Sequence, residues 1–484
     1  MPGESSTRVE AVRRAKIVCT LGPAVESPER MEGIINAGMN VARLNMSHGD
    51  YNEHAARYQL VRDTAERLGK RVAILADLQG PKIRLGKFEN NEKHYLEVGQ
   101  EFTITIDDIE GTVERCSTTF KGLPADVTVG DLLLIDDGKV SLEAIEVTAN
   151  DVRTRTVVPG YVSNNKGINL PGVAVNVPAM SEKDEADLRW ALRQGVDLIA
   201  LSFVRTGDDI KRAHEIMDEE GRRLPVVAKL EKPQAIENMQ DIIDKFDAVM
   251  VARGDLGVEL PLESVPIAQK RIVEAARIWA KPVIVATQML ESMTNNPRPT
   301  RAETSDVANA VIDGTDAVML SGETSVGDFP VETVATMAKI VENVEAHGID
   351  RIQRIDWDPH TTSGIMAKSA TEVAARLDAK YLIAFTSSGD TARRLSRLRP
   401  TTPMLAFTPS KDTAQQLALS WGIESYVTET FSVFNEMVKA VQEVMLNDGL
   451  VEAGDRVVIV YGSPMGTAGK TNAIRVHKIG TPLI

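Results

Sequence analysis

The sequence predicts an α/β protein built on a TIM (β/α)8 barrel, interrupted after its third strand by a small all-β lid domain and followed by a C-terminal α/β domain. Three observations support this prediction. Eight short β-branched runs alternate with amphipathic stretches, a long segment after the third run lacks helical periodicity, and the alternation restarts near residue 347. An open doubly wound sheet is the alternative interpretation of the same alternation.

The barrel is predicted from residues 1–79 and 177–346. Its eight strand-like runs begin at Lys16, Asn40, Arg71, Val196, Pro225, Asp247, Lys281 and Asp316. Helix signals lie between them, because Ser27 followed by Pro28 is typical of a helix start. Ser181 and Gly195 likewise predict the start and the end of another helix. Eight strand–helix units is the number that closes a barrel.

Two segments depart from the barrel rhythm. Residues 80–176 contain short alternating strands such as FTITID and VRTRTVV, punctuated by Gly, Asn and Asp. A connection of this length is expected to be a domain of its own, mounted at the barrel mouth as a lid. Residues 347–484 alternate between helical and strand patterns again, which predicts a C-terminal α/β regulatory domain.

Composition limits the classes of function. The chain of 484 residues has 55 basic and 69 acidic side chains and a net charge of −14, which argues against nucleic-acid or anionic-membrane binding. Its two cysteines, Cys19 and Cys116, are too few for a disulfide framework or a zinc site. No run of about eighteen apolar residues occurs. We therefore expect a soluble, cytoplasmic protein with no membrane partner.

Charged residues of opposite sign lie where the predicted strands end. Lys229 and Glu231 are two residues apart, so they emerge on the same face of a strand, and Arg253 and Asp255 repeat the pattern. In a TIM barrel all such ends meet at one mouth. The remaining polar residues at strand ends are Arg43, Asn45, Ser47, Asp77, Gln79, Lys82, Arg84, Thr287, Ser321 and Glu323. Independent salt bridges are the alternative for any one pair, but six strands together favour a single site.

The residue types at this mouth predict metal-assisted phosphoryl chemistry. Two carboxylates directed at one spot, Glu231 and Asp255, repel each other unless a cation lies between them. Oxygen ligands without His or Cys favour Mg²⁺, with Mn²⁺ as a substitute, over zinc. Arg43, Arg84 and Lys229 would suit the charge of a phosphoryl group. The glycine-rich stretch GSPMGTAGKTN near the C-terminus does not match a nucleotide-binding P-loop, because Pro464 occupies a required glycine position.

As a set, the motifs resemble the pyruvate kinase family. They are KIVCTLGPA, NVARLNMSHGD, ADLQGPKIR, KGINLPG, LSFVR, KLE, MVARGDLGVELP, ATQMLESM, PTRAETSDVANAV and LSGETSVGDFP, in this order along nearly the whole chain. The resemblance implies transfer of the phosphoryl group of phosphoenolpyruvate to ADP, giving pyruvate and ATP in glycolysis. It also implies a homotetramer.

The resemblance implies roles for individual residues. Lys229 would stabilise the transition state, Glu231 and Asp255 would hold the metal, and Thr287 would lie near the site of enolate protonation. Substrate would contact Arg43, Lys229, Thr287 and the backbone of Ala252, Arg253, Gly254 and Asp255. Arg84 and Lys166 would face the nucleotide, with Asp137 as a weaker candidate.

Two further expectations concern ligands. In many members, K⁺ is held by the positions of Asn45, Ser47, Asp77 and Leu78; here Leu78 lacks the needed side-chain oxygen and Lys82 replaces an acid, so K⁺ is predicted to be dispensable. Thr386, Ser387, Ser388, Gly389 and Thr391 resemble an effector loop for a monophosphate such as AMP or glucose 6-phosphate. Simple helix capping by Ser388 is the alternative for this loop.

Other functions fit parts of the same pattern. A metal-dependent enolate lyase or aldolase could use a similar barrel, but it would not need a lid with basic residues that face a nucleotide. A non-catalytic phosphometabolite-binding homologue should have lost at least one of Lys229, Glu231, Asp255 or Thr287, and all four are present.

Overall fold

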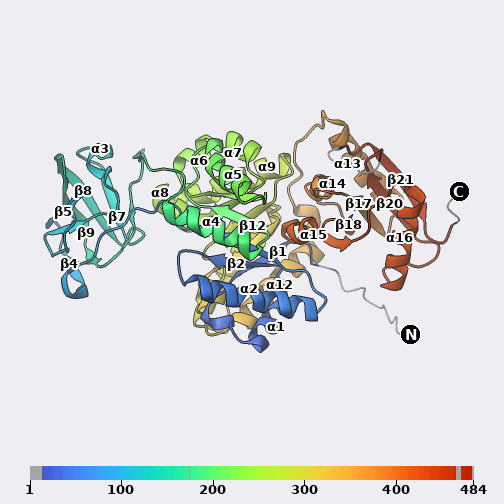
Figure 1. Cartoon of the computed structure of the whole chain (residues 1–484), viewed down its shortest axis with the longest axis horizontal. Coiled ribbons are helices and arrows are strands. Elements are labelled where there is room, and N and C mark those ends of the chain that lie inside the picture. Colours follow the sequence, from blue (N-terminus) through green and yellow to red (C-terminus); the bar gives the residue numbers. More distant parts are fainter. Residues whose placement is uncertain (1–12, 174, 465–469, 482–484) are drawn as a thin grey trace.

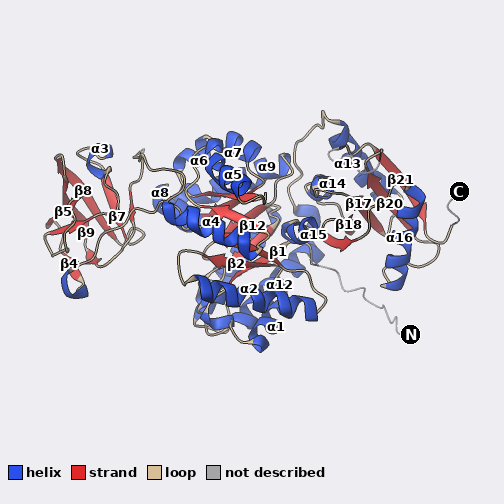
Figure 2. Cartoon of the chain, viewed as in Figure 1, coloured by secondary structure: helices blue, strands red, loops and turns tan. Residues whose placement is uncertain are grey.

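In a computed structural model of the chain, residues 13–173, 175–464 and 470–481 are described. Three bodies lie in a row along the long axis (Figure 1): a β-rich unit at one end, a barrel in the middle and an α/β unit at the other end. Figure 2 shows helices around the central strands and almost none in the β-rich unit. Among the described residues, no helix is both long enough and apolar enough to cross a membrane.

Eight parallel strands close the barrel, as predicted, in the order β1-β16-β15-β14-β13-β12-β3-β2. They are β1 (Lys16–Thr20), β2 (Val41–Asn45), β3 (Ala73–Asp77), β12 (Leu198–Leu201), β13 (Val226–Leu230), β14 (Ala248–Ala252), β15 (Val283–Ala286) and β16 (Ala317–Leu320). Almost every strand residue is buried, because helices cover the outside and side chains fill the inside. The closed order excludes the open doubly wound sheet.

The helices of this unit start and stop where the sequence signals predict. The Ser27 side chain accepts from the Arg30 backbone N–H, and Gly195 ends its helix in the left-handed conformation at φ 94°. The helices are α1 (Pro28–Ala37), α2 (Tyr51–Arg67), α4 (Glu182–Gln194), α5 (Ile210–Glu219), α6 (Pro233–Glu237), α7 (Met239–Lys245), α8 (Arg253–Glu259), α9 (Val265–Ile278), α10 (Arg301–Ile312), α11 (Gly322–Ser325) and α12 (Pro330–Gly348).

The inserted unit is a six-stranded sheet in the order β11-β7-β8-β9-β5-β6, with a separate pair β10-β4. Its elements are β4 (His94–Leu96), β5 (Glu101–Thr105), β6 (Arg115–Ser117), α3 (Leu123–Asp126), β7 (Leu132–Ile135), β8 (Val140–Val147), β9 (Asp151–Val158), β10 (Gly160–Val162) and β11 (Ile168–Asn169). The inserted unit is β-rich as predicted, and it also contains a short helical turn, α3, that begins after Gly122 with Pro124 near its start. A core separate from that of the barrel, built around Phe102 and Leu142, holds this unit together.

The C-terminal unit is a five-stranded sheet in the order β19-β18-β17-β20-β21, parallel except for β21. Its elements are α13 (Thr362–Arg376), β17 (Tyr381–Phe385), α14 (Asp390–Ser396), β18 (Met404–Thr408), α15 (Lys411–Gln416), β19 (Ile423–Val427), α16 (Phe434–Asn447), β20 (Arg456–Tyr461) and β21 (Ala473–Lys478). The strand β21 follows the stretch GSPMGTAGKTN at the place where a P-loop requires a helix.

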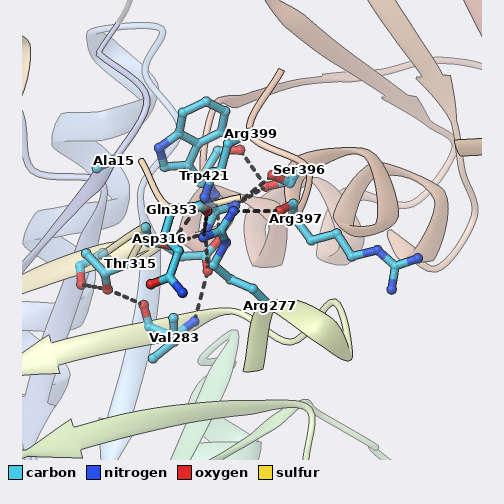
Figure 3. Close-up of polar contacts among 12 residues, drawn as sticks. Ala15, Arg277, Val283, Thr315, Asp316, Gln353, Ser396, Arg397, Arg399 and Trp421 are labelled. Carbon is cyan, nitrogen blue, oxygen red and sulfur yellow. Dashed lines mark hydrogen bonds and ion pairs between the residues drawn. The ribbon is translucent and has the colours of Figure 1, made fainter. Parts of the chain in front are cut away.

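A buried polar cluster joins this unit to the barrel (Figure 3). Asp316, just before β16, pairs with Arg399 at 2.9 Å and also accepts the backbone N–H groups of Val283 and Trp421. Arg399 donates further to the Gly314 carbonyl. One carboxylate therefore accepts hydrogen bonds from both the barrel and the C-terminal unit.

Candidate active site

Lys229, on β13, contacts polar side chains at the ends of three neighbouring barrel strands. Its Nζ lies 3.3 Å from Asp77 at the end of β3 and 3.0 Å from Glu231 just beyond β13. It also donates to the Ser202 hydroxyl at 2.7 Å. Burial opposes the charged form of Lys229, but Asp77 and Glu231 outweigh it and raise the pKa of the ammonium. Lys229 is therefore held as a fixed positive charge.

Asp77 has a second cationic partner in Arg43 on β2. The Arg43 Nε donates to Asp77 at 2.7 Å, and its Nη1 donates to the Thr20 hydroxyl at 3.0 Å. Burial would raise the pKa of Asp77, yet Lys229 and Arg43 lower it overall. Arg43 and Lys229 thus share one carboxylate and lie on the same side of the mouth.

Glu231 and Asp255 are the carboxylates predicted to bind metal. Glu231 is buried, and its pKa is raised by burial and further by Asp255, while Lys229 opposes the shift. A divalent cation would stabilise the ionised pair, so the residues present fit a hard metal. Within the described residues no group of three or more His, Cys, Asp or Glu side chains converges on a metal position. Substrate and water oxygens would have to complete the coordination.

Thr287 follows β15 in a conformation that β-branched residues rarely adopt, with φ 72°. Its hydroxyl accepts the Gly254 backbone N–H at 2.8 Å. This bond ties the loop after β15 to the start of α8, which carries Asp255. Backbone strain of this kind is concentrated at functional sites.

Arg253 is a brace between these elements. Its guanidinium lies 2.8 Å from Asp306 and donates to the Thr287 carbonyl at 2.7 Å. The Arg253 side chain therefore joins the loop after β15 to α10 through Asp306.

The residues predicted to face the nucleotide lie at the base of the inserted unit. The Arg84 guanidinium donates to the Asn165 carbonyl at 3.0 Å, and Lys166 pairs with Asp136 at 2.9 Å. Asp137 lies 3.6 Å from Lys82, which also lies 3.5 Å from Asp255. Lys82 thus links Asp137 of the inserted unit to Asp255 of the barrel.

Comparison with known proteins decides the family. The model for "Pyruvate kinase, barrel domain" matches residues 12–334, and that for "Pyruvate kinase, alpha/beta domain" matches residues 365–477. The chain is 54% identical to "Pyruvate kinase" of Corynebacterium glutamicum, covering 97% of this chain and 98% of that one. It is 52% identical to "Pyruvate kinase" of Mycobacterium tuberculosis H37Rv, covering 97% and 99%. The chain belongs to the pyruvate kinase family.

A solved structure agrees with this membership. The crystal structure of a pyruvate kinase from Cryptosporidium parvum matches with a TM-score of 0.90 and 34% identity, covering 96% of each chain. The activity is accordingly the transfer of the phosphoryl group of phosphoenolpyruvate to ADP, which makes the enzyme a phosphotransferase of glycolysis. Neither the enolate lyase nor the non-catalytic homologue is supported.

Two side chains of this pyruvate kinase mouth were missed from the sequence. Ser202 follows β12, and its hydroxyl accepts a hydrogen bond from Lys229. Thr20 ends β1, and its hydroxyl accepts a hydrogen bond from Arg43. Applying the strand-end rule to all eight strands would have found both. Glu323, by contrast, was expected at the mouth but is fully buried, where it accepts the Leu290 and Ser321 backbone N–H groups.

The predicted monovalent-cation positions are only partly brought together. Asn45 is engaged by His48 and by the Ser47 backbone N–H, both at 3.2 Å. Leu78 is packed in the barrel core and has no side-chain oxygen, and its backbone carbonyl accepts the Ser202 hydroxyl at 2.7 Å. The Asp77 carboxylate already pairs with the side chains of Lys229 and Arg43, as described above.

The predicted effector loop borders a cavity of about 90 Å³ in the C-terminal unit. Thr386, Ser387, Ser388 and Thr391 line it together with Lys470. Gly389 begins α14 at φ 83° and donates to the Thr386 hydroxyl, and no side chain caps the helix, so capping by Ser388 does not occur. In the neighbouring stretch GSPMGTAGKTN, positions 465–469 lie outside the described residues.

Proposed function

We propose that Lys229 is the catalytic residue that stabilises the transferring phosphoryl group and the developing enolate. The position of its Nζ between Asp77 and Glu231 supports this role, because the charge is fixed in place before substrate arrives. Pyruvate kinases need a divalent metal. Glu231 and Asp255 would hold it as Mg²⁺, or Mn²⁺ in its place, and the metal would neutralise phosphoryl oxygens.

Substrate binding is assigned to the elements around this lysine. Arg43 would bind the phosphate of phosphoenolpyruvate, as would the backbone of Ala252–Asp255, with Thr287 near the pyruvyl end. Thr287 lies beside that backbone, near the place where the enolate takes its proton. The rare φ of Thr287 supports a role in positioning, since such strain persists only where the surroundings impose it.

Residues 80–176 are proposed to act as the lid, and residues 1–79 with 177–346 as the catalytic barrel. Arg84 and Lys166 would bind nucleotide phosphates, with Asp137 beside them. Lid closure would bring ADP to the phosphoryl group and exclude water, which would otherwise accept it.

K⁺ is proposed to be dispensable. Lys82 lies 3.5 Å from Asp255 and would supply the positive charge that K⁺ brings to other members. Few oxygens remain to bind a cation at the positions Asn45, Ser47, Asp77 and Leu78. Leu78 has no side-chain oxygen, and the Asn45 side chain already contacts His48.

Residues 347–484 are proposed to regulate the enzyme through the cavity beside Thr386 and Ser388. Lys470 is balanced there by Asp390 and Glu429, which favours a monophosphate such as AMP or glucose 6-phosphate over a bisphosphate. Thr391 is less available, since its hydroxyl is shared with Thr471 at 2.6 Å.

A cytoplasmic homotetramer is proposed as the working form. The edge strand β21 pairs with β20 alone, with Val476 45% exposed, and the barrel exposes 74% of Leu262 and 60% of Ile267. Exposed apolar groups of this kind suit contacts between copies of the chain. Light scattering coupled to gel filtration gives the mass directly, and a monomer at micromolar concentration would contradict the proposal.

The catalytic assignment is tested by a coupled assay of ATP formed from phosphoenolpyruvate and ADP. The Glu231→Gln and Asp255→Asn variants should require far more Mg²⁺ for half-maximal rate. An unchanged Mg²⁺ requirement in both variants would move the metal elsewhere.

A further inference from the structure

Helix α8 touches both connections between lid and barrel. Asp255 and Glu259 are four residues apart, so they lie on one face of this helix. Asp255 meets Lys82 on the chain entering the lid, whereas Glu259 meets Asn169 on β11, the last strand before the chain returns to the barrel. The helix that carries a metal carboxylate therefore also carries the attachment of the lid.

The Glu259 attachment is buried and charged. The Asn169 side-chain amide donates to Glu259 Oε1 at 2.9 Å, and the Lys232 ammonium pairs with the same oxygen. Asn169 is 3% exposed and Glu259 6% exposed. Lys232 in addition lies 5.7 Å from the centre of the Phe203 ring. A charge-assisted bond in such surroundings is strong, and breaking it leaves a buried carboxylate short of a donor.

The attachment at Lys82 is looser. Its distances to Asp255 and Asp137 are 3.5 and 3.6 Å, and the Asp137 side chain is 62% exposed. A largely apolar cavity of about 30 Å³, bordered by Ile168, Asn169 and Phe203, lies beside the Glu259 bond. The contacts at the Glu259 connection are thus shorter and more buried than those at Lys82.

We propose that Asn169, Glu259 and Lys232 form the pivot on which the lid turns. Lys166 lies three residues before Asn169, so the pivot sets where its ammonium stands relative to Asp255. Glu259 is a positioning residue in this scheme, because it acts on the nucleotide through the lid. The inference rests on the proposed placement of the nucleotide beneath the lid.

The Asn169→Ala variant tests the pivot. Loss of one hydrogen bond to a charged group should raise the KM for ADP by about tenfold, while the KM for phosphoenolpyruvate and the Tm stay near those of the wild type. Glu259→Gln keeps an acceptor for Asn169 and should raise the KM for ADP less than Glu259→Ala does. Lys121→Ala, which removes an exposed lid pair with Asp108, is the matched control and should change neither KM.

An unchanged KM for ADP in Asn169→Ala would overturn the pivot. Equal rises in both KM values together with a lowered Tm would overturn it as well, since they would indicate general loss of structure. Lys166→Ala separates the two proposals. If that variant leaves the KM for ADP unchanged, the nucleotide site is wrong; if it raises the KM and Asn169→Ala does not, only the pivot is wrong.

Discussion

The Nζ of Lys82 lies 3.5 Å from Oδ1 of Asp255. These residues come from different units of the fold, Lys82 from the chain entering the lid and Asp255 from helix α8. A lysine ammonium therefore lies next to a carboxylate assigned to the divalent metal. A second cation brought close to Lys82 would be repelled.

This relationship predicts activity without a monovalent cation. In buffer containing Mg²⁺ but neither K⁺ nor NH₄⁺, the enzyme should turn over substantially, and added K⁺ should stimulate it little. Steady-state rates at constant ionic strength, adjusted with a tetraalkylammonium salt, measure this. An enzyme that is silent until K⁺ is supplied would show that the Lys82 charge does not replace it.

The Lys82→Glu variant is the reciprocal experiment. It reverses the charge beside Asp255, so activity should fall and the remaining activity should respond more strongly to K⁺. Lys82→Met serves as the control that removes the charge without reversing it, and it should give an intermediate response.

Lys229→Met should lower kcat by on the order of 10²–10³, as loss of one preorganised donor at a reacting oxyanion commonly does. Binding of Mn²⁺, followed by electron paramagnetic resonance, should persist because Glu231 and Asp255 remain. Lys245→Met is a matched control, since Lys245 also lies between two carboxylates, Asp208 and Asp241, but on the surface. Near-normal turnover in Lys229→Met would remove the catalytic assignment.

The double variant Thr386→Ala, Ser388→Ala should lose activation by AMP and glucose 6-phosphate while keeping its basal rate. Both side chains line the proposed effector cavity, so the double variant removes two hydroxyl groups that would donate hydrogen bonds to a bound phosphate. Thr401→Ala, at an exposed position of the same unit, is the control. If every phosphometabolite still activates the double variant, the effector site lies elsewhere.

Lys16 predicts a pH dependence of stability. Its buried Nζ donates to the Ile423 carbonyl at 2.9 Å, and burial lowers the pKa of this lysine to about 8. Between that value and the ordinary 10.5, the unfolded chain holds a proton that the folded chain does not. Stability therefore rises with pH across this window, by roughly 1.4 kcal/mol for each unit of pKa shift.

Urea unfolding at about pH 7.5, below the window, and at about pH 9.5, inside it, measures this contribution. Relative to Lys16→Met, the wild type should gain stability as the pH rises. Lys70 is an exposed lysine that borders the same cavity as Lys16, and Lys70→Met should follow the wild type at both values. Parallel behaviour of the wild type and Lys16→Met would contradict the lowered pKa.

Local rules were enough to predict the fold and the centre of the site. The spacing of Lys229 and Glu231 requires a common face, and the structure brings their charges to 3.0 Å. The rule that strand ends meet at the barrel mouth also predicts that Arg43 on β2 and Asp77 on β3 lie together, as the structure shows. Both strands are far in sequence from β13, which carries Lys229. The roles assigned to these residues remain predictions.

Contacts that depend on how the lid docks could not be predicted. Asn169 and Glu259 are 90 positions apart and belong to different units, so no periodicity relates them. Glu323 was predicted to lie at the mouth but does not, because a carboxylate at a strand end can turn inward and bind backbone N–H groups. The sequence alone does not distinguish these two orientations.

The Asp316–Arg399 pair makes the barrel and the C-terminal unit depend on each other for stability. If either unit unfolded alone, a carboxylate or a guanidinium would be left buried without its partner, at a cost of about 3–5 kcal/mol. The two units should therefore melt in one calorimetric transition, and Asp316→Asn should divide it into two. Amide hydrogens of β16 and β17 should exchange at similar rates in the wild type, because a single global opening exposes both strands.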